Sequence, residues 1–265
     1  MLLAIDIGNS HTVIGLFKDD LLIGQWRLQS DRNRTDDELA ISCHGFLSLG
    51  GVNTDTISGI IVASVVPRLA TAWLSCCRKY LSANLKRPLV TVSAETIKDL
   101  LQVKTECPEA VGADRLVNAI AGWHKYHGNL VIIDFGTAIT FDCVSAQGAF
   151  LGGAILPGIA IALEALSART AQLPTIDIGV GPEKVIGINT VQAMKSGILH
   201  GYGSLVDGMI HKISLEMGCA KKELIVIATG GMAHLIAPYS QSIGKLEPML
   251  TLEGLYLIHS RQTAP

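Results

Sequence analysis

An internal repeat constrains the fold of this chain more than any other feature of its sequence. Residues 2–28 and residues 130–156 both read as an apolar strand ending in Asp-x-Gly, a short polar turn, a second β-rich run, a hairpin turn and a third strand. Asp6-Ile7-Gly8-Asn9 aligns with Asp134-Phe135-Gly136-Thr137 at a constant offset. Two such tetrapeptides could coincide by chance, but two whole meanders in register could hardly do so. The sequence therefore predicts a duplicated three-stranded unit.

Helical patterns follow each meander. The capping-box residues Thr35–Glu38 predict a helix that runs to about Leu49, and a second helix is predicted over 67–83. Apolar residues at three- and four-residue spacing predict a long helix over 190–215. The remaining predicted elements are strands over 60–64, 89–92 and 224–228, and helices beginning near 112 and spanning 158–168 and 250–259. Both halves are thus mixed α/β, with the first three strands antiparallel.

Composition limits the kind of protein. Hydrophobic residues make up 49% of the chain and charged residues 17%, which is ample apolar material for sizeable cores and argues against a disordered chain. Lys and Arg number 21 against 23 Asp and Glu, and this formal net charge of −2 leaves no basic excess for binding nucleic acid. The six cysteines form no CxxC pair and have no histidines at zinc-ligand spacing, so we expect reduced thiols in a cytoplasmic protein.

Neither a signal peptide nor a membrane span is expected. The first residues lack a basic leader, and Asp6 interrupts their apolar stretch. The apolar run over 149–166 contains several glycines, Pro157 and Glu164, which fits a buried strand, a turn and a helix start better than a span.

The two Asp-x-Gly turns are typical of a polyphosphate site. Glycine after each aspartate lets the backbone approach a ligand, and the amides that follow point into the same space. Further donors come from the side chains of Asn9, Ser10, Thr12, Thr137 and Thr140. Facing each other across a cleft, the turns would hold phosphates while the two aspartates hold a divalent cation, which suits phosphoryl transfer. The alternative is that both aspartates only end strands and cap turns.

These residues resemble a known family. The two meanders are similar to the phosphate-1 and phosphate-2 elements of the acetate and sugar kinase, Hsp70 and actin superfamily, and residues 228–233 resemble its adenosine loop. Within that superfamily, essentially the whole chain resembles type III pantothenate kinase. The stretches that carry the resemblance are Asp6–Ser10, Gly112–Arg115, Asp134–Ala138, Gly152–Gly158, Ala171–Pro174 and Ile186–Thr190.

The resemblance implies an α/β fold with two duplicated ribonuclease-H-like (actin-like ATPase) domains and a central cleft. Residues 1–115 would form the N-terminal domain with the phosphate-1 loop. Residues 116–265 would form the C-terminal domain with the phosphate-2 and adenosine loops and a dimer helix. The implied reaction is ATP-dependent phosphorylation of pantothenate to 4′-phosphopantothenate, the first step of coenzyme A synthesis, by a homodimer.

The resemblance also implies roles for individual residues. The ATP-binding residues would be Asp6, Ile7, Gly8, Asn9, Ser10, His11, Thr12, Val13 and Thr137, with Asp6 serving Mg²⁺. The pantothenate-binding residues would be Gly112, Ala113, Asp114, Arg115 and, from the neighbouring subunit, Thr190. Asp134 would ligate a monovalent cation, K⁺ or NH₄⁺.

The chemistry of Asp114 and Arg115 agrees with these implied roles. An alcohol needs a carboxylate within hydrogen-bond reach to accept its proton as the phosphoryl group leaves ATP, the part of a general base implied for Asp114. Arg115 would bind the carboxylate of the substrate through two hydrogen bonds, which lysine does less well. The alternative is an ordinary aspartate at a helix start and a surface arginine.

The chain departs from the family pattern at Thr105. Family members usually carry an aromatic residue, often tyrosine, three residues before the proline that precedes Gly-Ala-Asp-Arg, and counting back from Pro108 gives Thr105. A pantothenate contact would come from Thr105 itself, from Tyr80 or Tyr126, or be missing. A milder departure is serine at position 10, where threonine is commoner, and its hydroxyl can still donate.

Other functions fit parts of the sequence. One alternative keeps the fold and replaces catalysis by a role as an accessory regulator of transcription, although no basic stripe or recognition-helix pattern is present. Another is an actin- or Hsp70-like ATPase, but 265 residues leave little room for the long inserted subdomains of those proteins. The absence of a Walker-type motif excludes that class of NTPase. His124 and His127 would share a helix face, but no third metal ligand is suggested nearby, so we do not expect a metal site there.

Overall fold

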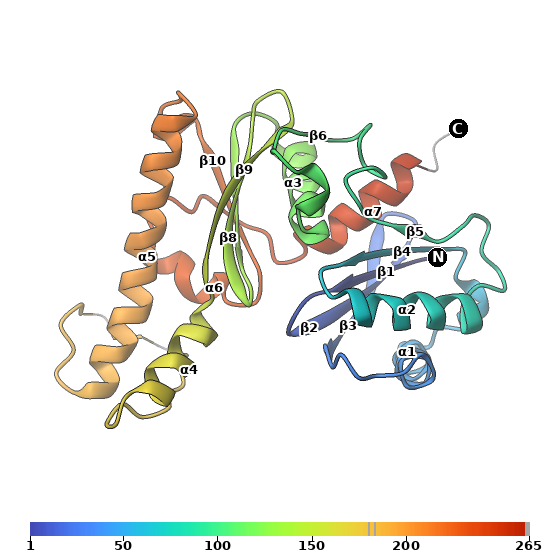
Figure 1. Ribbon diagram of the computed structural model, residues 1–265, viewed down its shortest axis with the longest axis horizontal. Coiled ribbons are helices and arrows are strands. Elements are labelled where there is room, and N and C mark those ends of the chain that lie inside the picture. Colours follow the sequence, from blue (N-terminus) through green and yellow to red (C-terminus); the bar gives the residue numbers. More distant parts are fainter. Residues whose placement is uncertain (180, 183, 263–265) are drawn as a thin grey trace. The chain divides into compact units, whose positions relative to one another are not determined.

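The computed structural model describes residues 1–262 apart from residues 180 and 183, and it divides into two compact units (Figure 1). The first unit contains Met1–Ala121 and the C-terminal helix α7 (Leu250–Gln262), and the second contains Gly122–Met249. The compact units differ from the predicted domains, because the boundary lies after residue 121 rather than 115 and the closing helix belongs to the first unit. The reason is packing, since α7 lies against the central strands of the first sheet.

The first sheet begins with the predicted meander. Strands β1 (Leu2–Ile7), β2 (His11–Lys18) and β3 (Leu21–Gln29) are antiparallel neighbours. The hairpin between β2 and β3 includes Asp19 at φ 56°, a left-handed conformation that aspartate tolerates in tight turns. Strand β4 (Gly59–Ser64) lies parallel to β1, and β5 (Val90–Thr91) lies parallel to β4. The strand order is β3-β2-β1-β4-β5.

The second sheet repeats this topology. Strands β7 (Leu130–Phe135), β8 (Ala138–Val144) and β9 (Ala149–Pro157) form the second antiparallel meander. Strand β10 (Ile225–Thr229) lies parallel to β7, and β11 (Lys245–Leu246) lies parallel to β10. The five strands that the second unit itself contributes follow the order β9-β8-β7-β10-β11, which matches the order of the first sheet and confirms the predicted duplication.

The two turns after the Asp-x-Gly strands differ in length. In the first copy the N–H of Gly8 donates to the carbonyl of His11 (3.1 Å), whereas in the second the N–H of Gly136 donates to the carbonyl of Ala138 (3.1 Å). The second turn is one residue shorter, so the constant offset of the two tetrapeptides does not continue into the second strands, where Val13 and Thr140 are the partners of Asp6 and Asp134. The pattern of apolar residues in the strands could not predict this difference, because one backbone hydrogen bond sets the length of each turn.

The first sheet buries one face under two helices. The side chains of Ile5 and Ile14 point to this face and pack with α1 (Asp36–Leu49) and α2 (Pro67–Tyr80), where Trp73 is fully buried. The predicted capping box is present: the Thr35 hydroxyl accepts the N–H of Glu38, and the Glu38 carboxylate accepts the N–H of Thr35. This cap stabilises the start of α1.

The opposite face of the first sheet is covered by α7, which also packs against α3 (Ala113–Tyr126). A Cβ built on Gly15 of β2 would lie 3.0 Å from both methyl carbons of Leu252 in α7. Thr251 of α7 donates its hydroxyl to the side-chain oxygen of Asn118 in α3 (2.8 Å). The C-terminal helix therefore completes the first unit.

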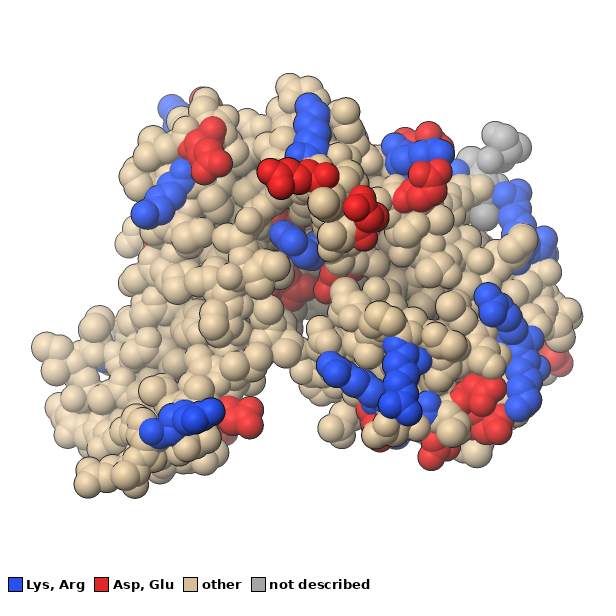
Figure 2. Space-filling view, viewed as in Figure 1, with Lys and Arg blue, Asp and Glu red and all other residues tan. Residues whose placement is uncertain are grey.

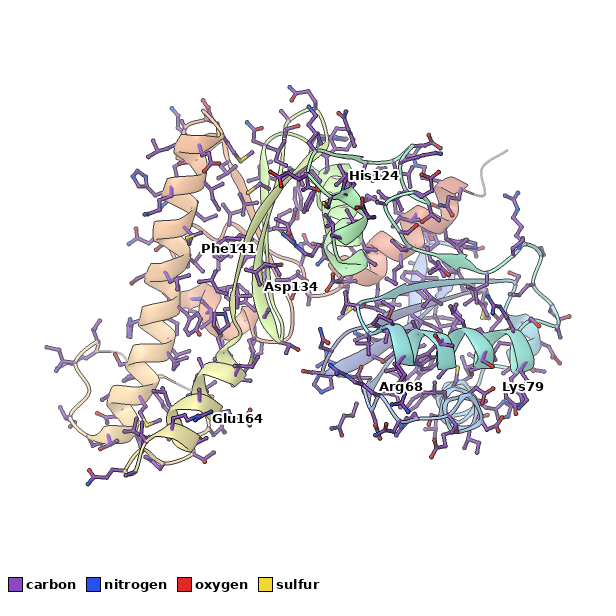
Figure 3. All side chains as sticks on the ribbon, in the orientation of Figure 1. Arg68, Lys79, His124, Asp134, Phe141 and Glu164 are labelled. Atoms are coloured by element: carbon purple, nitrogen blue, oxygen red, sulfur yellow. The ribbon has the colours of Figure 1, made fainter. Side chains whose placement is uncertain are left out.

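The second sheet buries its core face under α5 (Thr190–Glu216). Phe141 on β8 is fully buried with Val206 and Ile210 of α5, and Figure 3 shows Phe141 and Asp134 on opposite faces of the sheet. The Asn189 side chain caps α5 by accepting the N–H of Gln192 (2.9 Å). The apolar period predicted the helix, and Met194 and Ile198 from it are buried, but Val191 at its start is 41% exposed.

The remaining elements are short or close to their predicted bounds. They are η1 (Thr54–Thr56), β6 (Gln102–Val103), η2 (Pro108–Ala110), α4 (Ile159–Arg169), η3 (Lys221–Glu223), α6 (Ala233–Ile236) and η4 (Ala237–Tyr239). Predicted and observed ends differ by up to three residues, most at the ends of α2 and α7.

The surface carries both signs of charge. Figure 2 shows Lys and Arg side chains interspersed with Asp and Glu on the visible face. Among the residues that the structure describes, no helix combines the length and the apolar character needed to cross a bilayer.

Candidate active site

The turn after β1 adjoins a pocket. Asn9 and Ser10 are exposed at the tip of the turn that the Gly8–His11 hydrogen bond closes. The pocket has a volume of about 650 Å³ and is lined by Asn9, Ser10, His11, Arg27, Leu28, Gln29 and Ser30. This volume is in the usual range for small-molecule sites. The exposed part of the predicted ATP-binding stretch therefore has room for a ligand beside it.

Two other residues of the predicted ATP-binding stretch point inward. Ile7 is fully buried in the core, and Thr12 is 1% exposed. The Thr12 hydroxyl shares a hydrogen bond with the hydroxyl of Ser30 (3.0 Å), and the N–H of Ser30 donates to the carbonyl of Ser10 (2.9 Å). Thr12, which the sequence suggested as a side-chain donor to a ligand, thus holds the end of β3 against the turn.

The predicted base Asp114 lies at the same edge of the first sheet as the turn. A Cβ built on Gly112 would lie 3.3 Å from the Cγ1 of Val65, which follows β4. The N–H of Val65 donates to the carbonyl of Ile7, at the end of β1 (3.1 Å). Because β1 and β4 are parallel, their carboxyl ends share one edge. The structure therefore brings Asp114 to the edge at which β1, with Asp6 as its last residue but one, ends.

Burial sets the acidity of Asp114. Desolvation raises the pKa of its carboxyl above the ordinary value, by more than the N–H and the charge of Arg115 lower it. The backbone N–H of Arg115 donates to Asp114 Oδ1 (2.8 Å) and orients the carboxylate in the first turn of α3. A Cβ on Gly112 would lie 2.6 Å from the same oxygen, so glycine makes room for it. A carboxylate held in place with a raised pKa has the properties of a general base.

Asp134 is the last residue but one of β7 in the second unit, and the predicted adenosine loop comes close to it. Thr229 at the end of β10 pairs with Asp134, and the N–H of Met232 donates to the carbonyl of Phe135 (3.3 Å). Gly230 has a φ of 89°, and a Cβ there would collide with Asp134 Oδ1. The loop backbone therefore runs directly against the carboxylate, an approach that glycine allows.

Polar groups continue across this sheet from Asp134. Thr140 on β8 is its direct cross-strand partner, so both side chains lie on the face opposite Phe141. The Thr140 hydroxyl donates to Oδ2 of Asp142 (3.1 Å), whose side chain is fully buried. Oxygen atoms thus gather on this face near the end of β7.

Thr137 and Thr190 are both exposed in the second unit. Thr137 is the single residue between Gly136 and Ala138 in the short turn, and its carbonyl accepts the N–H of Gly158 (3.1 Å). Thr190 is the first residue of α5. Within the described ranges, no three His, Cys, Asp or Glu side chains are grouped as metal ligands.

Comparison with known proteins identifies the family. The family model for type III pantothenate kinase matches residues 2–212 of this chain. The chain belongs to the type III pantothenate kinase family. A relative of that name from Desulfotalea psychrophila is 50% identical, with 97% of each chain covered. Another from Desulforapulum autotrophicum is 43% identical, with 97% of this chain and 96% of the relative covered.

A solved structure supports the fold of this type III pantothenate kinase family member. A protein from Sinorhizobium meliloti described as a 2-dehydro-3-deoxygalactonokinase superposes with a TM-score of 0.59 at 13% identity, covering 100% of this chain and 97% of that one. Together with the matching sheets, this likeness confirms the predicted ribonuclease-H-like α/β class. Family membership makes the chain a kinase, and it favours the enzyme over the regulator of transcription.

At the position where type III pantothenate kinases usually have an aromatic residue, Thr105 has a buried hydroxyl. That oxygen has no hydrogen-bond partner among the described residues. The two alternatives, Tyr80 and Tyr126, donate their hydroxyls to the carboxylates of Asp37 and Glu247. Both tyrosines are therefore already engaged, and Thr105 is the one of the three whose polar atom lacks a partner.

Sequence reasoning missed the far wall of the pocket. Arg27 and Ser30 line it from the end of β3, about twenty residues after the Asp-x-Gly motif. The hairpin register was the signal that could have found them, since pairing β2 with β3 places Arg27 directly across from Val13.

Proposed function

We propose that the chain transfers the γ-phosphoryl group of ATP to the primary hydroxyl of pantothenate, giving ADP and 4′-phosphopantothenate in the first step of coenzyme A synthesis. The observation that carries this proposal is the position of Asp114, at the sheet edge where the Gly8–His11 turn leaves β1. Phosphoryl transfer to an alcohol needs a base near the phosphate-binding turn, and the first unit contains both.

In this reaction Asp114 acts as the base. The hydroxyl oxygen of pantothenate bonds to the γ-phosphorus, the bond from that phosphorus to the β,γ-bridging oxygen breaks, and the hydroxyl proton moves to the Asp114 carboxylate. The raised pKa makes this carboxylate a stronger base than an ordinary aspartate. Arg115, the next residue of α3, binds the pantothenate carboxylate, and Asn9 and Ser10 donate to the phosphates of ATP.

The residues fit the two cations that the reaction requires. Asp6 is half-buried beside an exposed turn, so one carboxylate oxygen and several waters suit Mg²⁺, which neutralises phosphate charge when it is bound. Asp134 is half-buried among the Thr140 hydroxyl and the backbone of the Gly230 loop, an oxygen-rich setting for a monovalent cation. Thr137, in the turn that follows Asp134, contacts ATP.

A homodimer is part of the proposal. Large apolar side chains are exposed on α4, on the first turn of α5 and in the segment before it, at one end of the second unit (Figure 1): Ile161, Leu166, Val185, Ile186, Ile188 and Val191. Ile186 and Ile188 are 84% and 86% exposed, and an apolar surface of this kind marks a protein interface. Thr190 lies in the same stretch, which supports its contact with pantothenate in a neighbouring subunit. We place the reaction in the cytoplasm, where thiols such as Cys43 stay reduced.

The variant Asp114→Asn tests the assignment of the base. Pantothenate-dependent ADP release, measured with ATP, Mg²⁺ and K⁺, should fall by about 10²- to 10⁴-fold, while ATP binding is retained. The control Asp20→Asn removes an exposed carboxylate at the far end of the β2–β3 hairpin and should leave the rate unchanged. Undiminished ADP release by Asp114→Asn would remove Asp114 as the base. Absence of any phosphorylated product from the wild-type protein would instead favour the transcriptional regulator. Release of ADP without pantothenate would favour an ATPase.

A further inference from the structure

The register of the first sheet puts an arginine on the same face as Asp6. Asp6 of β1 pairs with Val13 of β2, and Val13 pairs with Arg27 of β3. Directly paired residues of antiparallel strands project on the same side, so the three side chains form a row. This face is opposite the apolar core that receives Ile5 and Ile14. Two strand spacings, about 10 Å, separate the Cα atoms of Asp6 and Arg27.

Arg27 also belongs to the pocket beside the phosphate turn. It shares the lining with Asn9, Ser10 and His11, and that lining contains no aspartate or glutamate. The Arg27 side chain is exposed, and within the described part of the chain no hydrogen bond or ion pair engages its guanidinium. By contrast, Arg34 in the following segment donates to the Ser42 hydroxyl (3.3 Å). The Arg27 guanidinium therefore forms no hydrogen bond or ion pair with the described residues that would stabilise the fold.

A pocket with this lining favours an anion. The guanidinium presents donors in a planar fork that matches the oxygens of a phosphate, and the hydroxyl and amide side chains of Ser10 and Asn9 add further donors. No carboxylate of the lining balances the positive charge. The phosphate chain of ATP is the anion that the proposed reaction brings to this turn.

We propose that Arg27 is a further ATP-binding residue, whose guanidinium holds the phosphate chain from the β3 side while Asp6 serves Mg²⁺ from β1. The inference rests on the proposed function in one respect, that ATP occupies the turn after β1. It assigns Arg27 to the nucleotide rather than to the carboxylate of pantothenate, which Arg115 binds.

Three variants test this role in the full-length protein. Arg27→Ala removes the cation, Arg27→Lys keeps the charge without the fork, and Lys18→Ala is the matched control. Lys18 is an exposed cation on the same hairpin, five residues along β2 from Val13 and therefore about 17 Å away. Isothermal titration calorimetry gives the dissociation constants of ATP and of uncharged adenosine, and steady-state rates give KM for ATP and for pantothenate.

Arg27→Ala should weaken ATP binding and raise KM for ATP by about 10- to 100-fold, the range expected for a lost charge-assisted hydrogen bond. Adenosine affinity and KM for pantothenate should stay unchanged, Arg27→Lys should lie between wild type and Arg27→Ala, and Lys18→Ala should match wild type. Unchanged ATP affinity in Arg27→Ala would overturn the proposal, as would an equal loss for ATP and adenosine or a rise confined to KM for pantothenate.

Failure of the proposed function gives a different result. Wild-type protein that binds ATP but releases no ADP with pantothenate would refute the reaction, and the ATP affinities of the variants would still decide the role of Arg27. Wild-type protein that binds no ATP would overturn both.

Discussion

Replacing Gly112 by alanine should disable Asp114 while the protein stays folded. The new Cβ would lie 2.6 Å from Asp114 Oδ1 and 3.3 Å from Val65 Cγ1. Non-bonded carbon contacts are normally about 3.5 Å or longer, so the carboxylate has to move by about 1 Å. A displacement of that size in a reacting group costs about 10²-fold in rate. The crowding itself should cost about 1–3 kcal/mol of unfolding free energy, because the closer neighbour, the carboxylate, is the movable end of a side chain and the contact with Val65 is only slightly short.

A coupled assay of ADP release gives kcat and KM for Gly112→Ala, and urea titration gives its free energy of unfolding. Gly45→Ala is the matched control, since Gly45 lies in α1 with no atom within 4 Å of a built Cβ. It should keep full activity and gain about 1 kcal/mol of stability from helix propensity. If Gly112→Ala kept kcat within about threefold of wild type, the position of the Asp114 carboxylate would not control the reaction. A rise in KM for pantothenate alone would show that Gly112 contacts the substrate directly.

Three other results are expected. The base works as a carboxylate, and burial raises the pKa of Asp114. As the pH is lowered, kcat/KM should therefore begin to fall at a higher pH than it would with an aspartate of ordinary pKa. A pH profile that is flat on its acid side would contradict this. Thr105→Val removes a buried hydroxyl without a partner, so the ligand-free protein should gain about 1 kcal/mol in urea titrations, and a loss would reveal a partner. Burial raises the pKa of the Cys43 thiol to about 12. Iodoacetamide at about pH 8 should therefore alkylate the exposed Cys107 well before Cys43, which peptide mass spectrometry would measure. Equal rates of alkylation would show that Cys43 is accessible.

Local patterns predicted most of the fold. Each meander is specified by neighbouring segments, namely alternating apolar residues and hairpin turns, and the start of α1 by a four-residue capping box. The place of α7 could not be predicted in this way. Its apolar face is satisfied by strands made at the other end of the chain, and periodicity shows that a face is apolar without showing what covers it.

The site was predicted where it depends on motifs and missed where it depends on pairing. Gly112 and Asp114 are two residues apart in one short motif, so the motif alone predicts that they lie close together. The Thr12–Ser30 hydrogen bond joins residues 18 positions apart and diverts a hydroxyl that the motif alone assigns to the ligand. Arg27 reaches the pocket through the registers of two hairpins, and one slipped residue in either would place it on the other face.

The assignment of α7 to the first unit has a consequence for biosynthesis. The ribosome makes the strands of the first sheet before the second unit and α7 only after it, yet Leu252, Leu255 and Ile258 of α7 are buried in the first unit. The first sheet therefore emerges with one side uncovered and stays uncovered until α7 is made, whereas every described strand and helix of the second unit precedes α7 along the chain. A nascent chain stalled before Leu250 would expose the uncovered side of β1 and β2 to chaperones, and loss of the last helix would damage the half of the molecule that was made first.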